Sequence, residues 1–314
     1  MASTSGLTTF NLDLSEIVEE AFERCGTQLR TGYDLRTARR SLNLLTIEWA
    51  NRGINLWTVE EGSIVLNPGQ AIYPISADTI DLLDHVIRQN NGSSSNQTDI
   101  NISRISEPTY SSIPNKLTTG RPIQVYFTRQ SGLTDATATT TLASTGTTPP
   151  VSATDTSITV VDATNLPSTG WIQIDSETIG YTNIVGNVLT NCWRGQNGTT
   201  ATSHTAGTSI YSQYLPTINV WPTPNDGGDY TFVYWRMRRI QDAGTGVNIQ
   251  DIPFRFITCL VAGLAYLLSV KIQGVDPQRV MFLKADYEDQ FGLASAEDRE
   301  TAPVRFVPRT LFYS

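Results

Sequence analysis

The chain has 314 residues, of which 39% are hydrophobic and 17% charged, a composition typical of a globular protein with room for two domains. The net charge of −8 argues against tight duplex-DNA binding, because such binding normally requires clustered Lys and Arg side chains. An acidic wall past which DNA slides is compatible with this charge.

Two amphipathic helices are predicted near the start of the chain. Residues 14–25 place apolar side chains at i, i+3, i+4 and i+7, and Asp13 and Glu16 form a capping box before Gly26 ends the helix. A second apolar stripe predicts a helix over residues 34–52. We expect these two helices to pair as an αα-hairpin.

Short β-like runs separated by turns follow from about residue 56 to residue 129, with an exposed loop expected at residues 90–98. A comparable strand pair is predicted at residues 218–221 and 230–236. Between these regions, residues 136–213 contain one basic residue and no helical period, which indicates an inserted β domain. Five short strands are predicted in it and favour a small sandwich: 157–161, 171–174, 178–182, 188–193 and 208–211.

Two further helices are predicted at residues 253–273 and 277–291, each with Pro near its first turn. The first is apolar on most of its circumference, so we expect several neighbours to cover it. Its longest uncharged run, residues 256–270, is shorter than the about 20 residues that a bilayer requires, and we predict no membrane association. Residues 303–314 form an apolar end that prolines keep from being helical and that is expected to bind a partner.

Five short motifs stand out along the chain: DLRTARRSLNLL at 34–45, EWANRG at 48–53, NPG at 67–69, YF at 126–127 and WPTP at 221–224. In these motifs the sequence resembles the head-to-tail adaptor family of short-tailed phages (podoviruses), also called tail tubular protein A. The resemblance covers residues 10–135 and 214–314. The insertion departs from this adaptor pattern. It is similar to a module of phage structural proteins, in which residues 170–174 precede 177–181, and residues 194–199 precede Ala201, His204 and Gly207.

The resemblance implies an α+β subunit with a helical-bundle adaptor core, a small β-sheet region and an inserted all-β domain with an immunoglobulin-like (Ig-like) sandwich. The core would comprise residues 1–135 and 214–302, the insertion 136–213 and the C-terminal tail 303–314. Such subunits form a homo-oligomeric ring of twelve copies at the head-tail junction of the virion, assembled in the bacterial host cytoplasm. The ring would bind the portal protein and the tail nozzle protein, extend the DNA channel and help retain packaged DNA, which passes without sequence-specific binding.

The C-terminal tail inherits portal binding by its position in this resemblance. The residues assigned to that contact are Pro303, Val304, Arg305, Phe306, Val307, Arg309, Leu311, Phe312 and Tyr313.

An enzyme is the main rival class, but GxSxG, HExxH, GxxxxGK[ST] and GxGxxG motifs are all absent from the sequence. We interpret His85 as a packed strand residue and His204 as a hydrogen-bonding residue that fixes a turn. Three cysteines lie far apart without metal-ligand spacing. We therefore predict no catalytic residue, no metal site and no cofactor.

Charged clusters are given structural interpretations. The acidic residues Asp286, Glu288, Asp289, Glu297 and Asp298 are expected on a solvated helix face and its frayed end. Arg236, Arg238 and Arg239 are expected to pair with acidic neighbours rather than to contact DNA phosphates.

A second rival is a phage surface decoration or carbohydrate-binding adhesion protein. Trp171, Tyr181 and Trp193 of the insertion are residue types that stack on sugar rings, although the core of a small sandwich uses them equally well. We favour core packing for all three. Deleting the insertion distinguishes the two classes, because an adaptor would still join heads to tails.

Overall fold

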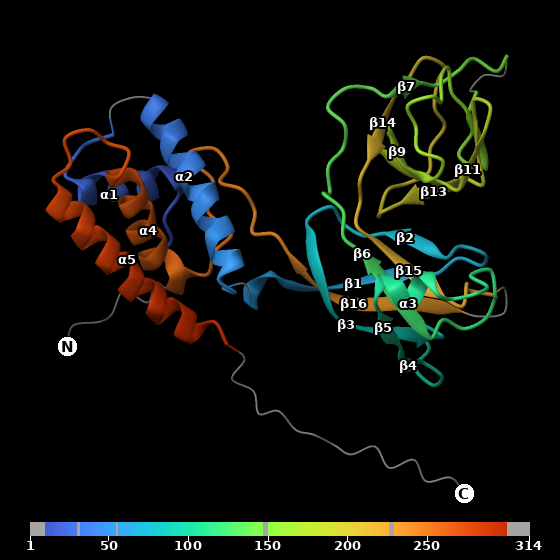
Figure 1. Ribbon diagram of the computed structural model, residues 1–314, viewed down its shortest axis with the longest axis horizontal. Helices are drawn as coiled ribbons and strands as arrows, with labels where there is room; N and C mark the ends of the chain where they lie inside the picture. The colour runs from blue at the N-terminus through green and yellow to red at the C-terminus, as the bar shows by residue number, and fades with distance from the viewer. Residues whose placement is uncertain (1–9, 30–31, 55, 147–149, 226–228, 300–314) are drawn as a thin grey trace, which may run out of the picture. The chain divides into compact units, whose positions relative to one another are not determined.

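The computed structural model describes residues 10–29, 32–54, 56–146, 150–225 and 229–299. The chain divides into two units, which are described separately (Figure 1). The helical unit consists of residues 1–59 and 239–314, and the β unit of residues 60–238. The predicted adaptor core contributes to both units.

The helical unit is built from four long helices around one core. They are α1 (Leu14–Cys25), α2 (Gly32–Asn51), α4 (Ile257–Ser269) and α5 (Pro277–Glu297), with the short turns η1 (Leu56–Thr58) and η2 (Phe254–Phe256). The predicted capping box is confirmed: Asp13 accepts a hydrogen bond from the Glu16 amide, and the Glu16 carboxylate accepts one from the Asp13 amide. Gly26 ends α1 with a φ of +76°.

Helix α4 lies against α1, α2 and α5 (Figure 1). Its side chains Leu260, Leu264 and Leu268 are fully buried in the core of this unit. The expectation that several neighbours cover α4 is met within one subunit, so the apolar surface of α4 is no argument for assembly. The predicted bounds 253–273 also include the η2 turn and a segment beyond Ser269 that is not helical.

The β unit begins with two four-stranded sheets that enclose a common core. The first has the order β1 (Val59–Val65), β16 (Tyr230–Arg238), β3 (Thr79–Gln89), β4 (Thr98–Asn101). The second has the order β2 (Ile72–Pro74), β15 (Thr217–Trp221), β6 (Gln124–Thr128), β5 (Ser103–Ile105), and the short helix α3 (Glu107–Ser111) follows β5. Leu82 and Phe232 from the first sheet and Phe127 and Ile218 from the second are buried in this core.

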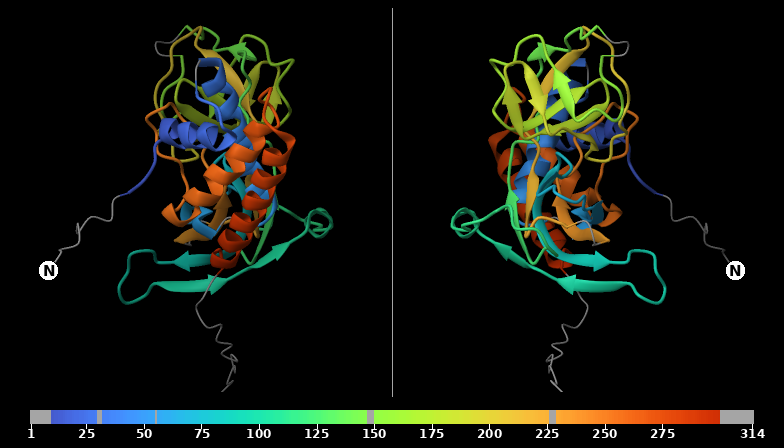
Figure 2. Two further views of the ribbon diagram at one scale, coloured as in Figure 1. Left: turned by 90° about the vertical axis from the view of Figure 1, so that its left-hand side faces the viewer. Right: turned by 90° about the vertical axis from the view of Figure 1, so that its right-hand side faces the viewer.

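Strands β3 and β4 form a hairpin whose tip stands clear of the rest of the unit in both views of Figure 2. The tip is the polar segment that the sequence predicts as an exposed loop. Its turn uses positive φ angles at Asn90 and Gly92, of +53° and +84°.

Residues 136–213 form a second pair of sheets with a core of their own. The five-stranded sheet has the order β13 (Trp193–Gln196), β10 (Glu177–Tyr181), β9 (Gly170–Ile174), β14 (Ser209–Gln213), β7 (Thr140–Thr141). The three-stranded sheet has the order β11 (Asn183–Val185), β12 (Val188–Thr190), β8 (Ser157–Thr159). Ile172, Ile179 and Ile210 of the larger sheet and Ile158 and Leu189 of the smaller one are fully buried.

The predicted fold class, an α+β subunit with a helical-bundle core and a small β region, is wrong. Four sheets make the described part of the chain mostly β, and the long helices are confined to one unit. The reason is the pairing of distant strands. β15 pairs with β2 and with β6, and β16 pairs with β3, across separations of about 90 to 160 residues. Local periodicity carries no record of such pairings.

The connection to the insertion requires a glycine at position 132. Gly132 has a φ of +72°, and a Cβ atom there would lie 2.2 Å from the Ala77 carbonyl oxygen. We expect Gly132→Ala to lower the free energy of unfolding by more than the about 1 kcal/mol that left-handed backbone alone costs an L-residue. Gly69→Ala is the control, because Gly69 has a φ of +77° but no atom near its Cβ position. Equal losses in urea unfolding for the two variants would contradict the close approach.

Candidate functional site

The predicted portal-binding residues, Pro303 to Tyr313, lie outside the described residues. The structure therefore neither supports nor opposes their role. Two other regions hold clustered polar or aromatic groups: a buried ion cluster in the insertion and a cavity beside its five-stranded sheet.

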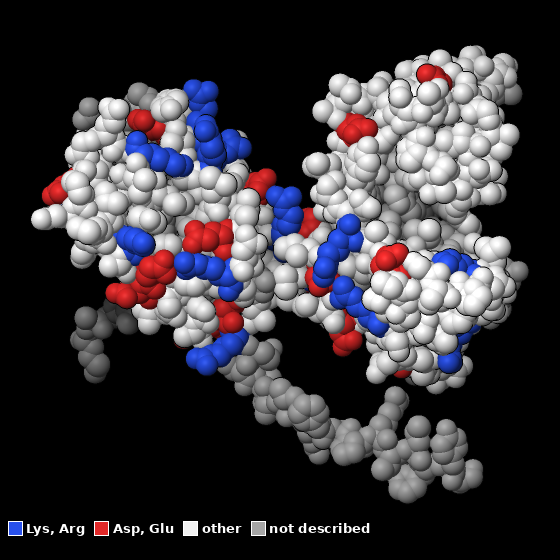
Figure 3. All heavy atoms as spheres, viewed as in Figure 1, with Lys and Arg blue, Asp and Glu red and all other residues white. Residues whose placement is uncertain are grey.

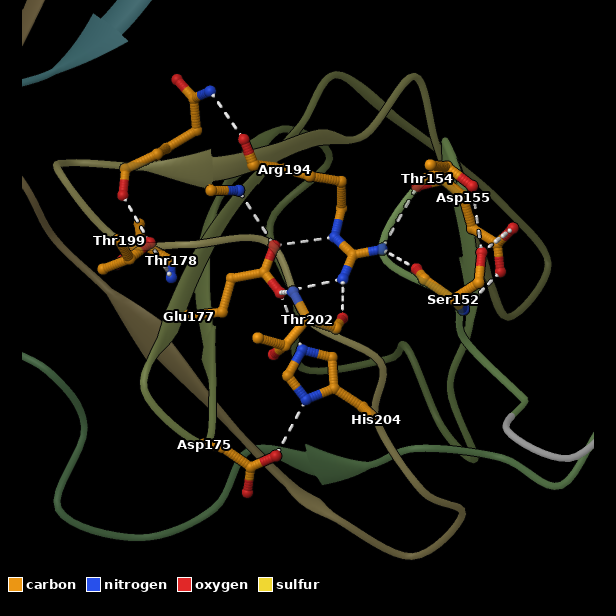
Figure 4. A network of polar contacts seen from close by, with 12 residues as sticks. Ser152, Thr154, Asp155, Asp175, Glu177, Thr178, Arg194, Thr199, Thr202 and His204 are labelled. Carbon is orange, nitrogen blue, oxygen red and sulfur yellow. Dashed lines mark hydrogen bonds and ion pairs between the residues drawn. The ribbon is translucent and has the colours of Figure 1, made fainter.

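The buried ion cluster centres on the carboxylate of Glu177 at the start of β10 (Figure 4). This carboxylate accepts five hydrogen bonds. They come from Nε and Nη2 of Arg194, both at 2.8 Å, from the amides of Gly195 and Thr202 at 2.9 and 3.0 Å, and from Nε2 of His204 at 2.8 Å. Glu177 is fully buried and His204 is 1% exposed.

Arg194 and His204 extend the cluster to other loops of the insertion. Arg194 donates to the carbonyl oxygens of Ser152 and Thr202. The other ring nitrogen of His204 lies 2.8 Å from an oxygen of Asp175 (Figure 4). Arg194 and His204 of the phage-module motif thus meet at the carboxylate of Glu177, up to 27 residues away, and the cluster joins four segments of the insertion. The predicted structural role of His204 is confirmed by these bonds.

Burial alone would raise the pKa of Glu177, but the hydrogen bonds from Arg194, the two amides and His204 outweigh it and hold the pKa at about 2. An ionised carboxylate whose acceptor positions are all occupied has no free position for a substrate or a water molecule. The cluster is therefore built to hold loops together. No group of three or more potential ligand residues suited to a metal ion occurs in the described part of the chain.

The lowered pKa of Glu177 makes the stability of the insertion depend on acid. Because the folded pKa of about 2 lies below the usual 4.5, the carboxylate contributes its full stabilisation above pH 4.5 and loses it as the pH falls towards 2. We expect amide hydrogen exchange in β9, β10 and β13 to accelerate over this range beyond the change in intrinsic chemical rates. Constant protection of these strands between about pH 5 and pH 2.5 would contradict the proposed ionisation.

The arginines of the first sheet are paired with acidic side chains, as predicted for Arg236 and Arg238. Arg236 contacts Asp78 and Glu60, and Arg238 also contacts Glu60. Arg239 follows the end of β16. Sequence reasoning missed a second group, in which Asp81 accepts from Arg104 at 2.7 Å and from Arg129 at 2.6 Å. These pairings leave little free positive charge on the two sheets for phosphate groups.

His85 lies in β3 and packs against the ring of Phe232, with 5.9 Å between ring centroids. This confirms the packed strand residue that the sequence predicts. Burial lowers the pKa of His85, and neither ring nitrogen has a hydrogen-bond partner among the described residues.

Three acidic residues of α5, including Asp286 beside Arg24, contact basic side chains. Glu288 pairs with Arg52 at 3.2 Å, and Glu297 pairs with Arg255 at 3.0 Å. Asp298 accepts a hydrogen bond from the Leu56 amide. The expected frayed end after residue 291 is wrong, because α5 continues to Glu297.

A cavity of about 940 Å³ lies between the five-stranded sheet of the insertion and the second sheet of the β unit. Trp171, Trp193 and Tyr214 line it from one side and Ile72, Tyr110 and Leu117 from the other. The expectation that all three insertion aromatics are core residues holds for Tyr181, which is 3% exposed. It is wrong for Trp171 and Trp193, which are half-buried and line the cavity.

The insertion is poor in charge. Its sequence contains one basic residue, Arg194, and four acidic ones, Asp155, Asp162, Asp175 and Glu177. Of these, Arg194 and Glu177 pair with each other in the buried cluster. On the face drawn in Figure 3, charged side chains are correspondingly sparse over this domain and frequent over the helices. Within the described residues, we find no helix with the length and apolar content of a membrane span.

Comparison with known families identifies the class of protein as a phage adaptor, a structural component of the virion. The model of the family named SU10 adaptor protein matches residues 127–307, more than half of the chain, and the chain belongs to this family. No curated protein matches the chain. The matched span runs through the insertion and leaves out the motifs at residues 34–53 on which the sequence resemblance chiefly rested.

Proposed function

We propose that this protein is the head-to-tail adaptor of a phage particle, assembled as a ring between the portal protein and the tail nozzle protein. Membership in an adaptor family is the observation that carries the proposal. The ring would lie at the head-tail junction, extend the DNA channel and help to retain the packaged genome. From the motifs at residues 34–53, we also propose that the ring contains twelve copies and that the protein is related to the tail tubular protein A group.

The charge distribution supports passage of DNA without sequence-specific binding. The net charge is −8, and Arg236, Arg238, Arg104 and Arg129 are paired with carboxylates. A protein surface of this kind provides few contacts for phosphate groups. We also propose a structural role without catalysis. The acceptor positions of the buried Glu177 carboxylate are occupied by groups of the same domain, which leaves no position for a substrate.

We propose that residues 136–213 are an Ig-like accessory domain rather than part of the ring contact. Two antiparallel sheets packed over one core support this assignment. The ends of the domain lie side by side, because Gly132 donates to the Tyr214 carbonyl at 2.9 Å and Asp135 to the Ser212 carbonyl at 2.9 Å. A short linker between residues 132 and 214 can therefore replace the domain.

Two deletions test the proposal. Removal of residues 303–314 should abolish co-sedimentation with portal rings while the circular dichroism and the unfolding transition stay unchanged. Removal of residues 136–213 should leave ring formation and portal binding intact, as seen by electron microscopy of the mixed components. A full-length protein that stays monomeric beside portal and nozzle components would overturn the adaptor ring. Loss of portal binding only in the second variant would assign the contact to the insertion.

A further inference from the structure

The outer face of the five-stranded sheet carries two tryptophans on either side of a glycine. Gly180 of β10 is the register partner of Trp171 in β9 and of Trp193 in β13. Residues paired across neighbouring strands point to the same face of a sheet. Trp193, Gly180 and Trp171 therefore form one row across three strands, and Gln213 of β14, paired with Trp171, continues it.

The glycine allows an aromatic ring to lie flat in this row. A Cβ atom on Gly180 would lie 2.4 Å from Cζ3 of Trp171, so the Trp171 ring covers the backbone of Gly180. Trp171 alternates along β9 with Ile172 and Ile174, which are buried in the core. The ring consequently faces out of the domain and forms the floor of the cavity of about 940 Å³.

The opposite wall of the cavity is held in place by polar contacts within the β unit. Gln70, which is 1% exposed, donates from Nε2 to Oε1 of Gln196 in β13 at 2.9 Å and to the Ile72 carbonyl at 2.8 Å. Tyr214 is anchored where the insertion joins β15, because its amide donates to the Leu133 carbonyl at 2.8 Å. The insertion and the second sheet, which form the two walls of the cavity, are thus connected by the Gln70–Gln196 hydrogen bond and by the chain segment around Tyr214.

The described lining of the cavity carries little charge. It contains no acidic residue, and Lys116 is its one basic residue. The Lys116 ammonium group donates to the carbonyls of Ser111 and Ile113 and lies 5.5 Å from the centre of the Tyr110 ring. An anionic ligand would therefore meet a single cation that already donates to two carbonyls, and a basic peptide would meet no anion in the described lining.

The remaining lining groups are neutral hydrogen-bonding side chains. They include amides and hydroxyls on the insertion side, such as Asn191 and Thr182, whose side chains bond to each other at 3.2 Å, and Asn219 on the opposite sheet. Oε1 of Gln213 accepts no hydrogen bond among the described residues, and a rotation of its side chain would present this oxygen to a hydroxyl group. Flat aromatic faces combined with neutral amides match the C–H faces and hydroxyl groups of sugars.

We propose that this cavity is a binding site for a neutral oligosaccharide, with one sugar ring stacked on Trp171 and another ring of the same chain beside Trp193. Neighbouring strands lie about 4.8 Å apart, so the backbones of these two residues, separated by one strand, lie about 10 Å apart, a span that an oligosaccharide of a few rings can cover. We infer a neutral ligand because the lining carries little charge. We infer a ligand with apolar faces and hydroxyl edges because two tryptophans lie in a row beside neutral polar groups. The site is independent of the ring assembly proposed above.

The test is calorimetric titration of the full chain with a panel of neutral oligosaccharides of glucose, galactose and N-acetylglucosamine. We expect saturable binding of at least one member. Trp171→Ala and Trp193→Ala should each weaken it about tenfold, the loss expected when one stacked ring is removed. Tyr33→Ala, which removes an exposed aromatic side chain on α2, should leave the affinity unchanged. Trp193→Phe, which keeps a stacking ring, should retain most of it and shows that the domain still folds.

Three outcomes would overturn the proposal: no member of the panel binds, the two alanine variants bind as well as the unchanged protein, or only a synthetic peptide of residues 303–314 binds. The last result would instead make the cavity a site for a protein segment. Portal co-sedimentation of Trp193→Ala should be normal, so failure of sugar binding and failure of the adaptor function are distinguishable.

Discussion

Glu177→Gln should strongly destabilise the insertion while the stability of the helical unit stays unchanged. The substitution keeps the size of the side chain but removes its charge and places an amide donor against Arg194 and His204. It leaves the Arg194 guanidinium, 8% exposed, without its counter-ion. Breaking one partner of a buried ion pair costs about 3 to 5 kcal/mol. A domain of this size has a total stability of about 5 to 10 kcal/mol, so about half of its stability would be lost.

Local probes are needed to measure this effect, because the chain has two units with separate cores. Hydrogen exchange should show β9, β10 and β13 losing protection while α4 keeps its own. Asp162→Asn is the matched control, since it is also a carboxylate-to-amide change in the insertion, but at an exposed position whose carboxylate accepts hydrogen bonds from Thr164. Equal protection of the three strands in both variants would show that the cluster is not what holds the loops.

Trp49→Ala should be the most damaging substitution in the helical unit. Trp49 is fully buried on α2, packs against Phe256 and donates from Nε1 to the Tyr287 hydroxyl at 3.2 Å. That hydroxyl in turn lies 3.2 Å from a carboxylate oxygen of Glu48. Removal of a buried tryptophan leaves a cavity and costs about 3 to 5 kcal/mol, and here it also leaves Tyr287 without one of its partners.

The control for Trp49→Ala is Leu44→Ala on the same helix, where the leucine is 54% exposed. Urea unfolding followed by the helical circular dichroism signal should show a large loss for the first variant and a loss of less than about 0.5 kcal/mol for the second. Because the proposed ring is built from folded subunits, Trp49→Ala should also fail to form rings. Normal rings from a destabilised subunit would place the ring contacts outside the helical unit.

Helix positions were the most predictable part of this fold. Their signals are local: the Asp13 and Glu16 capping box, the i, i+3, i+4 spacing and a following glycine all lie within one helix. The error at α4 came from the same local reasoning. Its nearly uniform apolar surface was interpreted as a demand for other subunits, whereas α1, α2 and α5 of the same chain cover it.

The sheets were predictable as strands but not as a domain. Individual runs such as residues 230–236 were recognised, while the pairing of β16 with β3 depends on contacts between segments about 150 residues apart. The large β unit was therefore taken for a small region between helices.

The alternation of apolar and other side chains along β9 contained a sequence signal for the cavity. In the sequence Gly170-Trp-Ile-Gln-Ile174, the two isoleucines share one face, and the tryptophan shares the other face with a glutamine. This parity places Trp171 on the polar face, and it would have corrected the expectation of core packing. The Glu177 cluster had a weaker signal. Glu177, Arg194 and His204 all belong to the recognised module motif, but their spacing in the sequence does not show that the three side chains meet.

The way the insertion joins its sheet has an evolutionary consequence. Thr134 and Gln213 pair across the two connecting segments. The two ends of the gene segment that encodes this domain therefore correspond to neighbouring points in the structure. An exchange at those positions would transfer a whole folding unit, with its own core and ion cluster, and would leave the pairing of β6 with β15 unchanged. Loss or replacement of the whole domain at these two points would thus keep the frame of the subunit that carries it.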